Sequence, residues 1–179
     1  MSARLVILGL LRERPLYGYE IKQIIEEHMS DWTSIAFGSI YFALDKLAEE
    51  KFVEKVGVEQ EGKRPSRSVY QITIAGREEF LRLLREVWGG LERQYFAIDI
   101  GLFFMAALPL DEIKEFLRRR VVQLEEILNY LDSHQREALA EDGIPRSAGA
   151  IFNHSRIHFQ GELSWTRELL AQVEQGKLQ

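Results

Sequence analysis

Positive charge gathers in one short stretch of this acidic chain. Lys63, Arg64 and Arg67 surround Pro65 in the segment EGKRPSRSVYQIT, although the 179-residue chain has a formal net charge of −5. Basic side chains at a bend can bind phosphate, and phosphate contacts supply much of the affinity of DNA-binding proteins. A solvated surface turn would explain the same charges. The elements on either side of the bend must therefore decide between the two readings.

Residues for other chemistry are sparse. The chain has no cysteine, which excludes disulfides, thiolate nucleophiles and cysteine-bound metal and fits a reducing cytoplasm. His154 and His158 are four residues apart on a predicted helix, but no third ligand accompanies them, so we expect no metal site. No catalytic Ser/His/Asp spacing, phosphate loop or nucleotide fingerprint occurs. We therefore expect neither an enzyme nor a cofactor.

Residues 1–90 are expected to form helices around a two-stranded hairpin. Apolar residues at helical spacing predict three helices before the bend, and alternating residues predict a strand on each side of it. Thr73 is suited to cap a fourth helix that ends at Gly89–Gly90. The expected ranges are 4–12, 17–29 and 38–51 for the helices and 52–58 and 67–74 for the strands. This order is that of a winged helix-turn-helix, with the third helix as the reading element and the hairpin loop as the wing.

The positions of side chains around the third helix suggest which of them would contact DNA. Ile40, Leu44 and Leu47 form its apolar stripe. Ser39, Phe42 and Lys46 are expected to face the major groove. Tyr41, at the edge of the stripe, is expected to contact phosphate, and Tyr17 and Tyr19 at the start of the second helix are expected to add phosphate hydrogen bonds. The predicted DNA-binding residues are Tyr17, Tyr19, Ser39, Tyr41, Phe42, Lys46 and the wing residues Lys63, Arg64 and Arg67.

Residues 91–179 are predicted to form an all-α dimerisation domain. The segment 95–108 is apolar on nearly all sides, which favours burial, and two long amphipathic helices are expected at 111–139 and 149–175. Apolar stripes on consecutive helices without a sheet predict packing against each other or against a second subunit. The residues expected at the dimer seam are Phe152, Phe159, Leu163, Trp165 and Leu170.

Charge and hydropathy restrict the partners of the chain. Residues 1–90 carry 13 basic and 14 acidic residues, and residues 91–179 carry 10 and 14, so no global field attracts nucleic acid. The apolar run 5–11 is followed at once by charged residues and is not expected to be a signal peptide. The most apolar segment, 98–110, contains Asp99 and is far shorter than the roughly 20 residues that span a bilayer. We expect a soluble cytoplasmic protein without a membrane partner.

Several blocks of the sequence resemble the PadR family of bacterial transcriptional regulators, in the subgroup with a long helical C-terminal dimerisation domain. They are LGLLRERPLYGYEIKQII, FGSIYFALDKLAEEKFVEK, GKRPSRSVYQITIAGREEF and the last helix with Trp165. The resemblance implies a homodimeric winged-helix repressor that binds double-stranded DNA at an inverted-repeat operator. It also implies response to a small aromatic effector, for which a cleft between the two domains, lined by Trp32, Tyr95, Phe96 or Trp165, is a candidate; packing in a core would explain the same aromatic residues. Phe42 departs from the family, since many relatives have proline there.

A winged helix used for protein contact is the main alternative. The third helix has Asp45, Glu49 and Glu50 beside one groove-facing cation, Lys46, and carboxylates near phosphates are unfavourable. The basic wing and the family resemblance favour DNA. The sequence does not specify the operator, the regulated genes, the effector, or whether the protein represses or activates.

Overall fold

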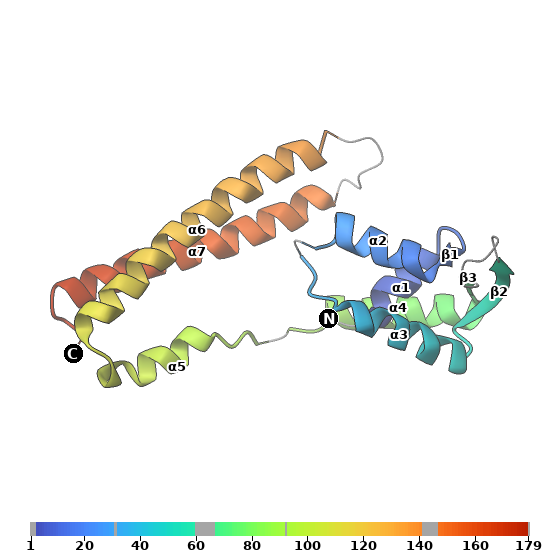
Figure 1. The fold of residues 1–179 in the computed structure, drawn as a ribbon, viewed down its shortest axis with the longest axis horizontal. Coiled ribbons are helices and arrows are strands. Elements are labelled where there is room, and N and C mark those ends of the chain that lie inside the picture. Colours follow the sequence, from blue (N-terminus) through green and yellow to red (C-terminus); the bar gives the residue numbers. More distant parts are fainter. Residues whose placement is uncertain (1–2, 31, 60–66, 92, 141–146, 179) are drawn as a thin grey trace. The chain divides into compact units, whose positions relative to one another are not determined.

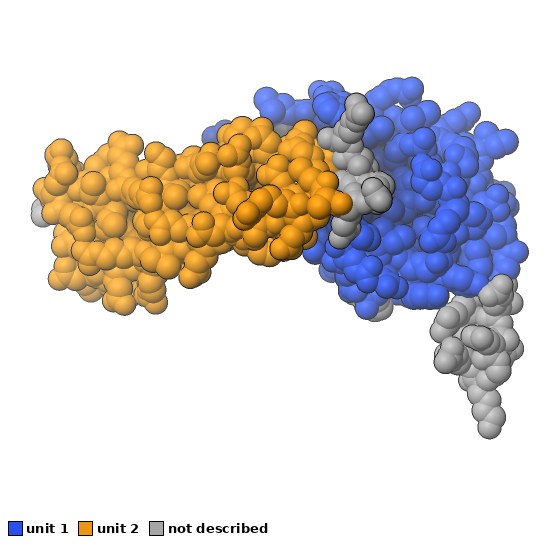
Figure 2. All heavy atoms as spheres, turned by 90° about the horizontal axis from the view of Figure 1, so that it is seen from above, with its two compact units in different colours: residues 1–93 blue, residues 94–179 orange. Residues whose placement is uncertain are grey.

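The computed structural model describes residues 3–30, 32–59, 67–91, 93–140 and 147–178 of the chain. It divides into two units, residues 1–93 and residues 94–179, which are coloured separately in Figure 2. We call the first unit the head and the second the tail, and describe each by itself. The DNA-binding and dimerisation roles expected of the two halves stay predictions at this point.

The head contains the predicted helices and hairpin in the predicted order, which confirms the winged helix-turn-helix (Figure 1). Three helices precede the two hairpin strands and a fourth follows them. A further two-residue strand, which the sequence did not reveal, lies between the first two helices. In chain order the elements are α1 (Ala3–Leu11), β1 (Leu16–Tyr17), α2 (Gly18–His28), α3 (Phe37–Glu49), β2 (Val53–Glu59), β3 (Arg67–Ile72) and α4 (Ile74–Gly89).

The core of the head forms where the apolar stripes of its helices meet one face of its sheet. Each helix places residues three or four apart on one side, and these are the residues that the structure buries. The sheet adds Val53, Tyr70 and Ile72. From the helices the fully enclosed residues are Ile7, Leu8, Leu11, Ile21, Ile40, Leu44 and Leu47. This core involves only head residues, so the head has the means to fold on its own.

The sheet has three antiparallel strands in the order β1-β3-β2. Lys55 pairs with Tyr70 and Gly57 pairs with the adjacent Val69, so Val56 is an extra residue that forms a β-bulge in β2. Strand β1 pairs Leu16 and Tyr17 with β3 directly before α2 begins. Two residues after Pro15 are too few to show an alternating pattern, which is why sequence periodicity did not predict this strand.

Thr73 fixes the start of α4 to the turn between α3 and β2. Its hydroxyl oxygen accepts a hydrogen bond from the Gly76 backbone N–H at 3.0 Å, which confirms the predicted helix cap. The same hydroxyl lies 2.8 Å from the carbonyl oxygen of Lys51 and 3.1 Å from that of Phe52. Lys51 has a positive φ of 63°, the left-handed conformation in which the chain leaves α3. One side chain thus links three elements of the head.

The tail is a helical hairpin preceded by a short helix. Its elements are α5 (Ala97–Phe103), a 3-10 turn (Met105–Ala107), α6 (Leu110–Ala138) and α7 (Ala148–Glu174). Helices α6 and α7 lie side by side along their length (Figure 1). Leu117, Leu124 and Leu131 are buried on α6, and their spacing of seven is that of a heptad pattern, which fits the amphipathic helix expected at 111–139. Among the helices that the structure describes, none is long and apolar enough to cross a membrane.

Several apolar side chains expected to be buried are exposed within the single chain. Helix α5 buries no residue, and Phe103 is 82% exposed, which contradicts the expectation for the segment 95–108. Val87 and Trp88 at the end of α4 are exposed as well, whereas Phe80 on the same helix is buried. Ile74, at the start of α4, is exposed too. Hydrophobicity shows that a side chain favours burial but not which chain buries it.

Candidate nucleic-acid interface

The outward face of α3 carries the side chains that could reach a base. Ile40, Leu44 and Leu47 hold the opposite face in the core. Phe42 points outward and is 67% exposed, as its angular position predicted, and Lys46 is exposed one turn later. A helix whose far side is anchored in a core and whose near side projects polar and apolar groups can enter a major groove. The outward face of α3 is therefore available for such a contact, and its role in reading DNA stays a prediction.

Three predicted phosphate-contacting tyrosines come together where α2 meets α3. The rings of Tyr17 and Tyr19 stack with their centroids 5.6 Å apart. Tyr41 packs against the first residue of α2, since a Cβ at Gly18 would lie only 3.0 Å from its ring. Gly18 thus allows Tyr41 of α3 to lie against the start of α2, next in sequence to both Tyr17 and Tyr19. Phenolic hydroxyls at such a helix junction can hydrogen-bond to phosphate oxygens.

Two of the predicted groove-facing residues are already hydrogen-bonded. The Lys46 ammonium donates to Glu49 Oε2 at 2.6 Å, and this contact raises the pKa of Lys46. The Ser39 hydroxyl donates to the backbone carbonyl of Ala36 in the turn before α3, which leaves its oxygen as an acceptor only. Lys46 would have to exchange Glu49 for DNA. Ser39 is better placed to fix the helix start than to donate to a base.

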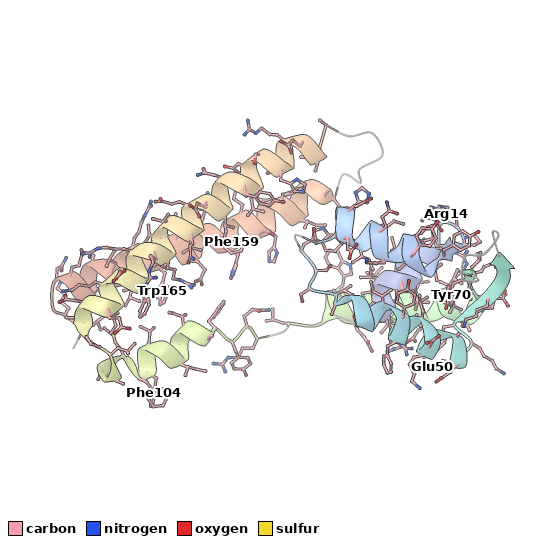
Figure 3. All side chains as sticks on the ribbon, in the orientation of Figure 1. Arg14, Glu50, Tyr70, Phe104, Phe159 and Trp165 are labelled. Carbon is pink, nitrogen blue, oxygen red and sulfur yellow. The ribbon has the colours of Figure 1, made fainter. Side chains whose placement is uncertain are left out.

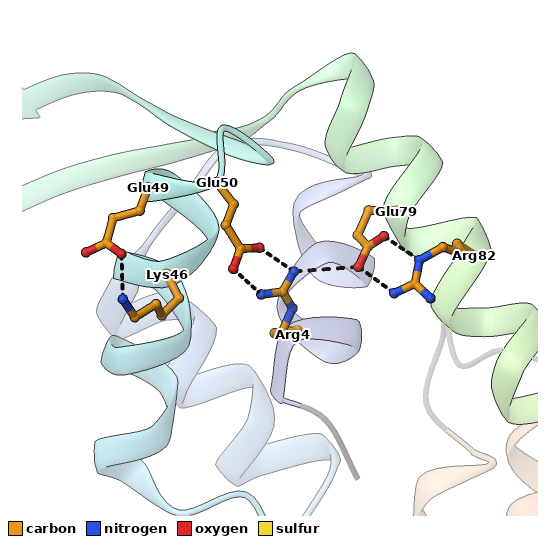
Figure 4. Close-up of polar contacts among 6 residues, drawn as sticks. All are labelled: Arg4, Lys46, Glu49, Glu50, Glu79 and Arg82. Carbon is orange, nitrogen blue, oxygen red and sulfur yellow. Dashed lines mark hydrogen bonds and ion pairs between the residues drawn. The ribbon is translucent and has the colours of Figure 1, made fainter.

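Cations on α3 and on other elements compensate the carboxylates of α3 and of Glu50, which directly follows it. Glu49 pairs with Lys46 on the helix itself, whereas Glu50 is held by Arg4 of α1 in a bidentate contact of 2.9 and 2.6 Å (Figure 4). The Asp45 carboxylate lies 3.9 Å from the ammonium of Lys55 on β2. The acidity that argued against DNA binding in the sequence is therefore largely neutralised. Sequence reasoning missed Arg4 and Lys55 because neither is close to α3 along the chain.

Arg4 also connects α3 to α4. Its guanidinium lies 3.5 Å from Glu79, which in turn pairs with Arg82 at 2.7 Å (Figure 4). The hydrogen bond from Arg4 lowers the pKa of Glu50, and the hydrogen bond from Arg82 is the main cause that lowers the pKa of Glu79. Both groups therefore stay charged at neutral pH. The network fixes the C-terminal end of the reading helix against two other helices of the head.

Most of the predicted wing tip lies outside the described residues. Lys63 and Arg64 belong to the stretch 60–66, so their contribution stays a prediction. Arg67 begins β3, where its backbone pairs with Glu59 of β2. The described strands end at Glu59 and resume at Arg67, on either side of this stretch.

The predicted dimer residues lie along α7. Leu163 is buried in the tail, and Trp165 and Leu170 pack on the cluster of Leu117, Leu169 and Val173. Phe152 and Phe159 are partly buried. The seam predicted against the long helix therefore runs at least partly within one chain. Helix α5 instead presents the larger exposed apolar surface, and Phe104 points away from α6 and α7 (Figure 3).

A small hollow in the tail includes one of the predicted effector residues. Phe96 stacks on His158, with ring centroids 6.0 Å apart, beside the ion pair of Arg120 and Glu162 at 2.6 Å. The hollow has a volume of about 220 Å³ and is lined by Phe96, Arg120, Gln123, Leu124, Ile127, His158, Phe159 and Glu162. Trp165 lies in the neighbouring apolar cluster, Tyr95 is exposed, and Trp32 belongs to the head. In the described ranges, no three side chains come together to hold a metal ion.

Comparison with known proteins gives a consistent result over the length of the chain. Residues 7–82 match the transcriptional regulator PadR-like family. A curated relative, the negative transcriptional regulator PadR of Bacillus subtilis, is 22% identical over 174 residues, which are 94% of this chain and 95% of the relative.

Two solved structures have the same fold. One is Bacillus subtilis PadR in complex with operator DNA, with a TM-score of 0.78 and 21% identity, covering 95% of this chain and 98% of that chain. The other is the same protein in complex with p-coumaric acid, with a TM-score of 0.78 and 21% identity over 97% of this chain and 99% of that chain. The similarity includes the tail helices as well as the head.

Proposed function

The chain belongs to the PadR-like family of DNA-binding transcriptional regulators, and from this premise we propose that it is a homodimeric repressor of an inverted-repeat operator. The outward face of α3, with Phe42 and Lys46 projecting from a helix anchored in the core, is the observation that carries the proposal. The tyrosine group beside it and the basic segment between β2 and β3 supply phosphate contacts. Repression is proposed because the curated relative is a negative regulator.

Selection of bound duplexes from a random DNA pool tests this function directly. A dimer with two-fold symmetry should enrich a pseudo-palindrome whose half-sites are about one helical turn apart or a multiple of it. The alternative, a winged helix that contacts protein, predicts that no sequence is enriched. Dependence of the affinity on salt separates real phosphate contacts from weak adsorption, because each contact contributes a slope of about −0.9 in log K against log salt.

Alanine at Lys63 and Arg64 should weaken binding to all duplexes to a similar extent. Each lost phosphate contact should flatten the salt slope by about one unit, since fewer counterions are released on binding. Titration of a labelled operator at several salt concentrations measures the slope. Lys177→Ala, at an exposed position beyond α7, is the control that removes a charge from the tail. A slope equal to that of the parent would identify the basic segment as an ordinary surface turn.

Lys46→Ala should weaken operator binding by about tenfold or more without lowering the melting temperature. The change removes a cation and also frees the Glu49 carboxylate, which would then repel phosphate. The double variant Lys46→Ala/Glu49→Gln should therefore recover part of the loss. Tyr41→Phe, which removes only a hydroxyl, should also weaken binding at an unchanged melting temperature. If Lys46→Ala and Tyr41→Phe both bind like the parent, α3 does not read DNA in the proposed way.

We also propose that a small aromatic acid releases the protein from its operator. Bacillus subtilis PadR has been crystallised with p-coumaric acid, and the hollow beside Phe96 offers a stacking surface and a guanidinium that could exchange Glu162 for a ligand carboxylate. A ligand changes the equilibrium only through different affinities for the free and the bound conformations. Aromatic packing without any ligand explains the same residues.

Addition of p-coumaric acid and related aromatic acids should therefore release labelled operator, with binding heat in calorimetry. Arg120→Gln should reduce the response while operator affinity without ligand stays the same. Gln160→Ala, an exposed position on the same helix as Glu162, should respond like the parent. Absence of heat and of release for every acid would mean that the hollow is only part of the tail packing.

A further inference from the structure

Asp45 has the least compensated carboxylate on the reading helix. Glu49 is bound by Lys46 at 2.6 Å, and Glu50 by both terminal nitrogens of Arg4. Asp45 has its cation at 3.9 Å, where the Lys55 ammonium also lies 5.5 Å from the centre of the Tyr70 ring. Its side chain is 65% exposed. Of the three, Asp45 can form a new hydrogen bond with the smallest loss of existing contacts.

Asp45 also occupies the right part of the helix. It follows Phe42 by three residues, and residues three apart lie on neighbouring positions of a helix surface. Both side chains project opposite the buried stripe of Ile40, Leu44 and Leu47. A groove that accommodates the Phe42 ring would therefore bring the Asp45 carboxylate to base edges rather than to the sugar-phosphate backbone.

A carboxylate in the major groove can accept a hydrogen bond from only a few groups. Phosphate oxygens repel it, and the N7 and O6 atoms of guanine and the O4 atom of thymine are acceptors. The exocyclic amino group of cytosine is the donor that aspartate and glutamate commonly meet. At the position that it reaches, Asp45 should favour cytosine over guanine and thymine, which present acceptors but no donor, and over adenine, whose amino group lies beside the N7 acceptor.

We propose that Asp45 is a specificity-determining residue that accepts a hydrogen bond from the amino group of one cytosine in each operator half-site. Lys55, whose ammonium lies 3.9 Å away, compensates the carboxylate in the free protein. The inference rests on the proposed function, since it requires that α3 reads DNA. Beyond that function, the inference names the base, cytosine, that the outward face of α3 selects.

Three random-pool selections test the proposal: the full-length parent, Asp45→Ala and Glu78→Gln. Glu78 is an exposed carboxylate on α4 and serves as the matched control for loss of one negative charge. The parent and Glu78→Gln should enrich cytosine at one position of each half-site. Asp45→Ala should lose that preference, with discrimination against the other bases falling about tenfold or more, while the remaining positions stay enriched.

Affinity for an unrelated duplex separates base reading from damage to the helix. Asp45→Ala should bind such a duplex as well as the parent or more tightly, because it removes a charge that repels phosphate. A change that merely disturbed α3 would weaken both specific and unspecific binding. Enrichment of the same bases by the parent and Asp45→Ala, or loss of all binding by Asp45→Ala, would overturn the inference. If the parent enriches no sequence, the proposed function fails together with it.

Discussion

Phe103→Glu should convert the full-length protein from a dimer to a monomer. Phe103 is 82% exposed in its own chain, Ile100 and Phe104 are mostly exposed as well, and no residue of α5 is fully buried. Burying a phenylalanine contributes about 1.5–3 kcal/mol, and a two-fold interface contains the change twice. A loss of about 4 kcal/mol or more would raise the dimer dissociation constant by roughly a thousandfold. Sedimentation at micromolar concentration measures the fraction of dimer. Gln160→Glu, at an exposed position of α7, is the control that adds the same charge.

The same change should weaken binding to a full operator far more than binding to a half-site. One head reads few base pairs, and a second head linked by the dimer supplies the additional contacts. A chain truncated after residue 93 retains the head core and should behave like the monomeric variant. A parent protein that sediments as a monomer, or a truncated head that binds the full operator with undiminished affinity, would rule out the dimer mechanism.

Gly76→Ala should destabilise the head by about 3 kcal/mol or more. A Cβ at this position would lie 2.0 Å from the Phe52 carbonyl oxygen and 2.8 Å from Ile72 Cγ1. The backbone at Phe52 cannot move away freely, because its carbonyl accepts from Thr73 N–H at 3.0 Å. Overpacking against backbone forces a shift that costs more than a flexible side-chain contact, and hydrogen bonds of the cap would be lost with it.

Gly89→Ala at the other end of α4 is the matched control. An added Cβ meets nothing within 4 Å there, and alanine is favoured over glycine in helices by up to about 1 kcal/mol. Its unfolding midpoint in denaturant should equal or exceed that of the parent, whereas Gly76→Ala should unfold at a clearly lower concentration. Equal midpoints for both variants would mean that α4 can move away from β2 at little cost.

Local features of the sequence predicted much of this fold. Stripes at helical spacing gave the helices of the head to within a few residues, and Thr73 caps α4 as its residue type suggests. The leucines spaced by seven on α6 are buried, and Leu117 packs with Leu169 and Val173 of α7. These features are readable because the residues that determine them are neighbours along the chain.

Features that depend on distant residues could not be predicted. Nothing near Glu50 in the sequence indicates its partner Arg4, 46 residues away, and nothing near Asp45 indicates Lys55 on the next strand. The grouping of Tyr41 with Tyr17 and Tyr19 required the position of Gly18 against α3. The exposure of α5 was missed because its hydrophobicity is the same whether its own chain or a second copy covers it.

The bulge at Val56 limits how wings can be exchanged among related proteins. Side chains alternate between the two faces of a strand, so omitting the extra residue would turn every β2 residue between the bulge and the loop to the opposite face. A graft that begins after Gly57 leaves the bulge in the host and transfers only the loop. A graft that begins before Lys55 must bring its own bulge. Without the bulge, the end of the strand that leads to the basic segment would have its two faces exchanged. The modular unit of this wing is therefore the loop together with the strand beyond Val56, and chimeras should be joined accordingly.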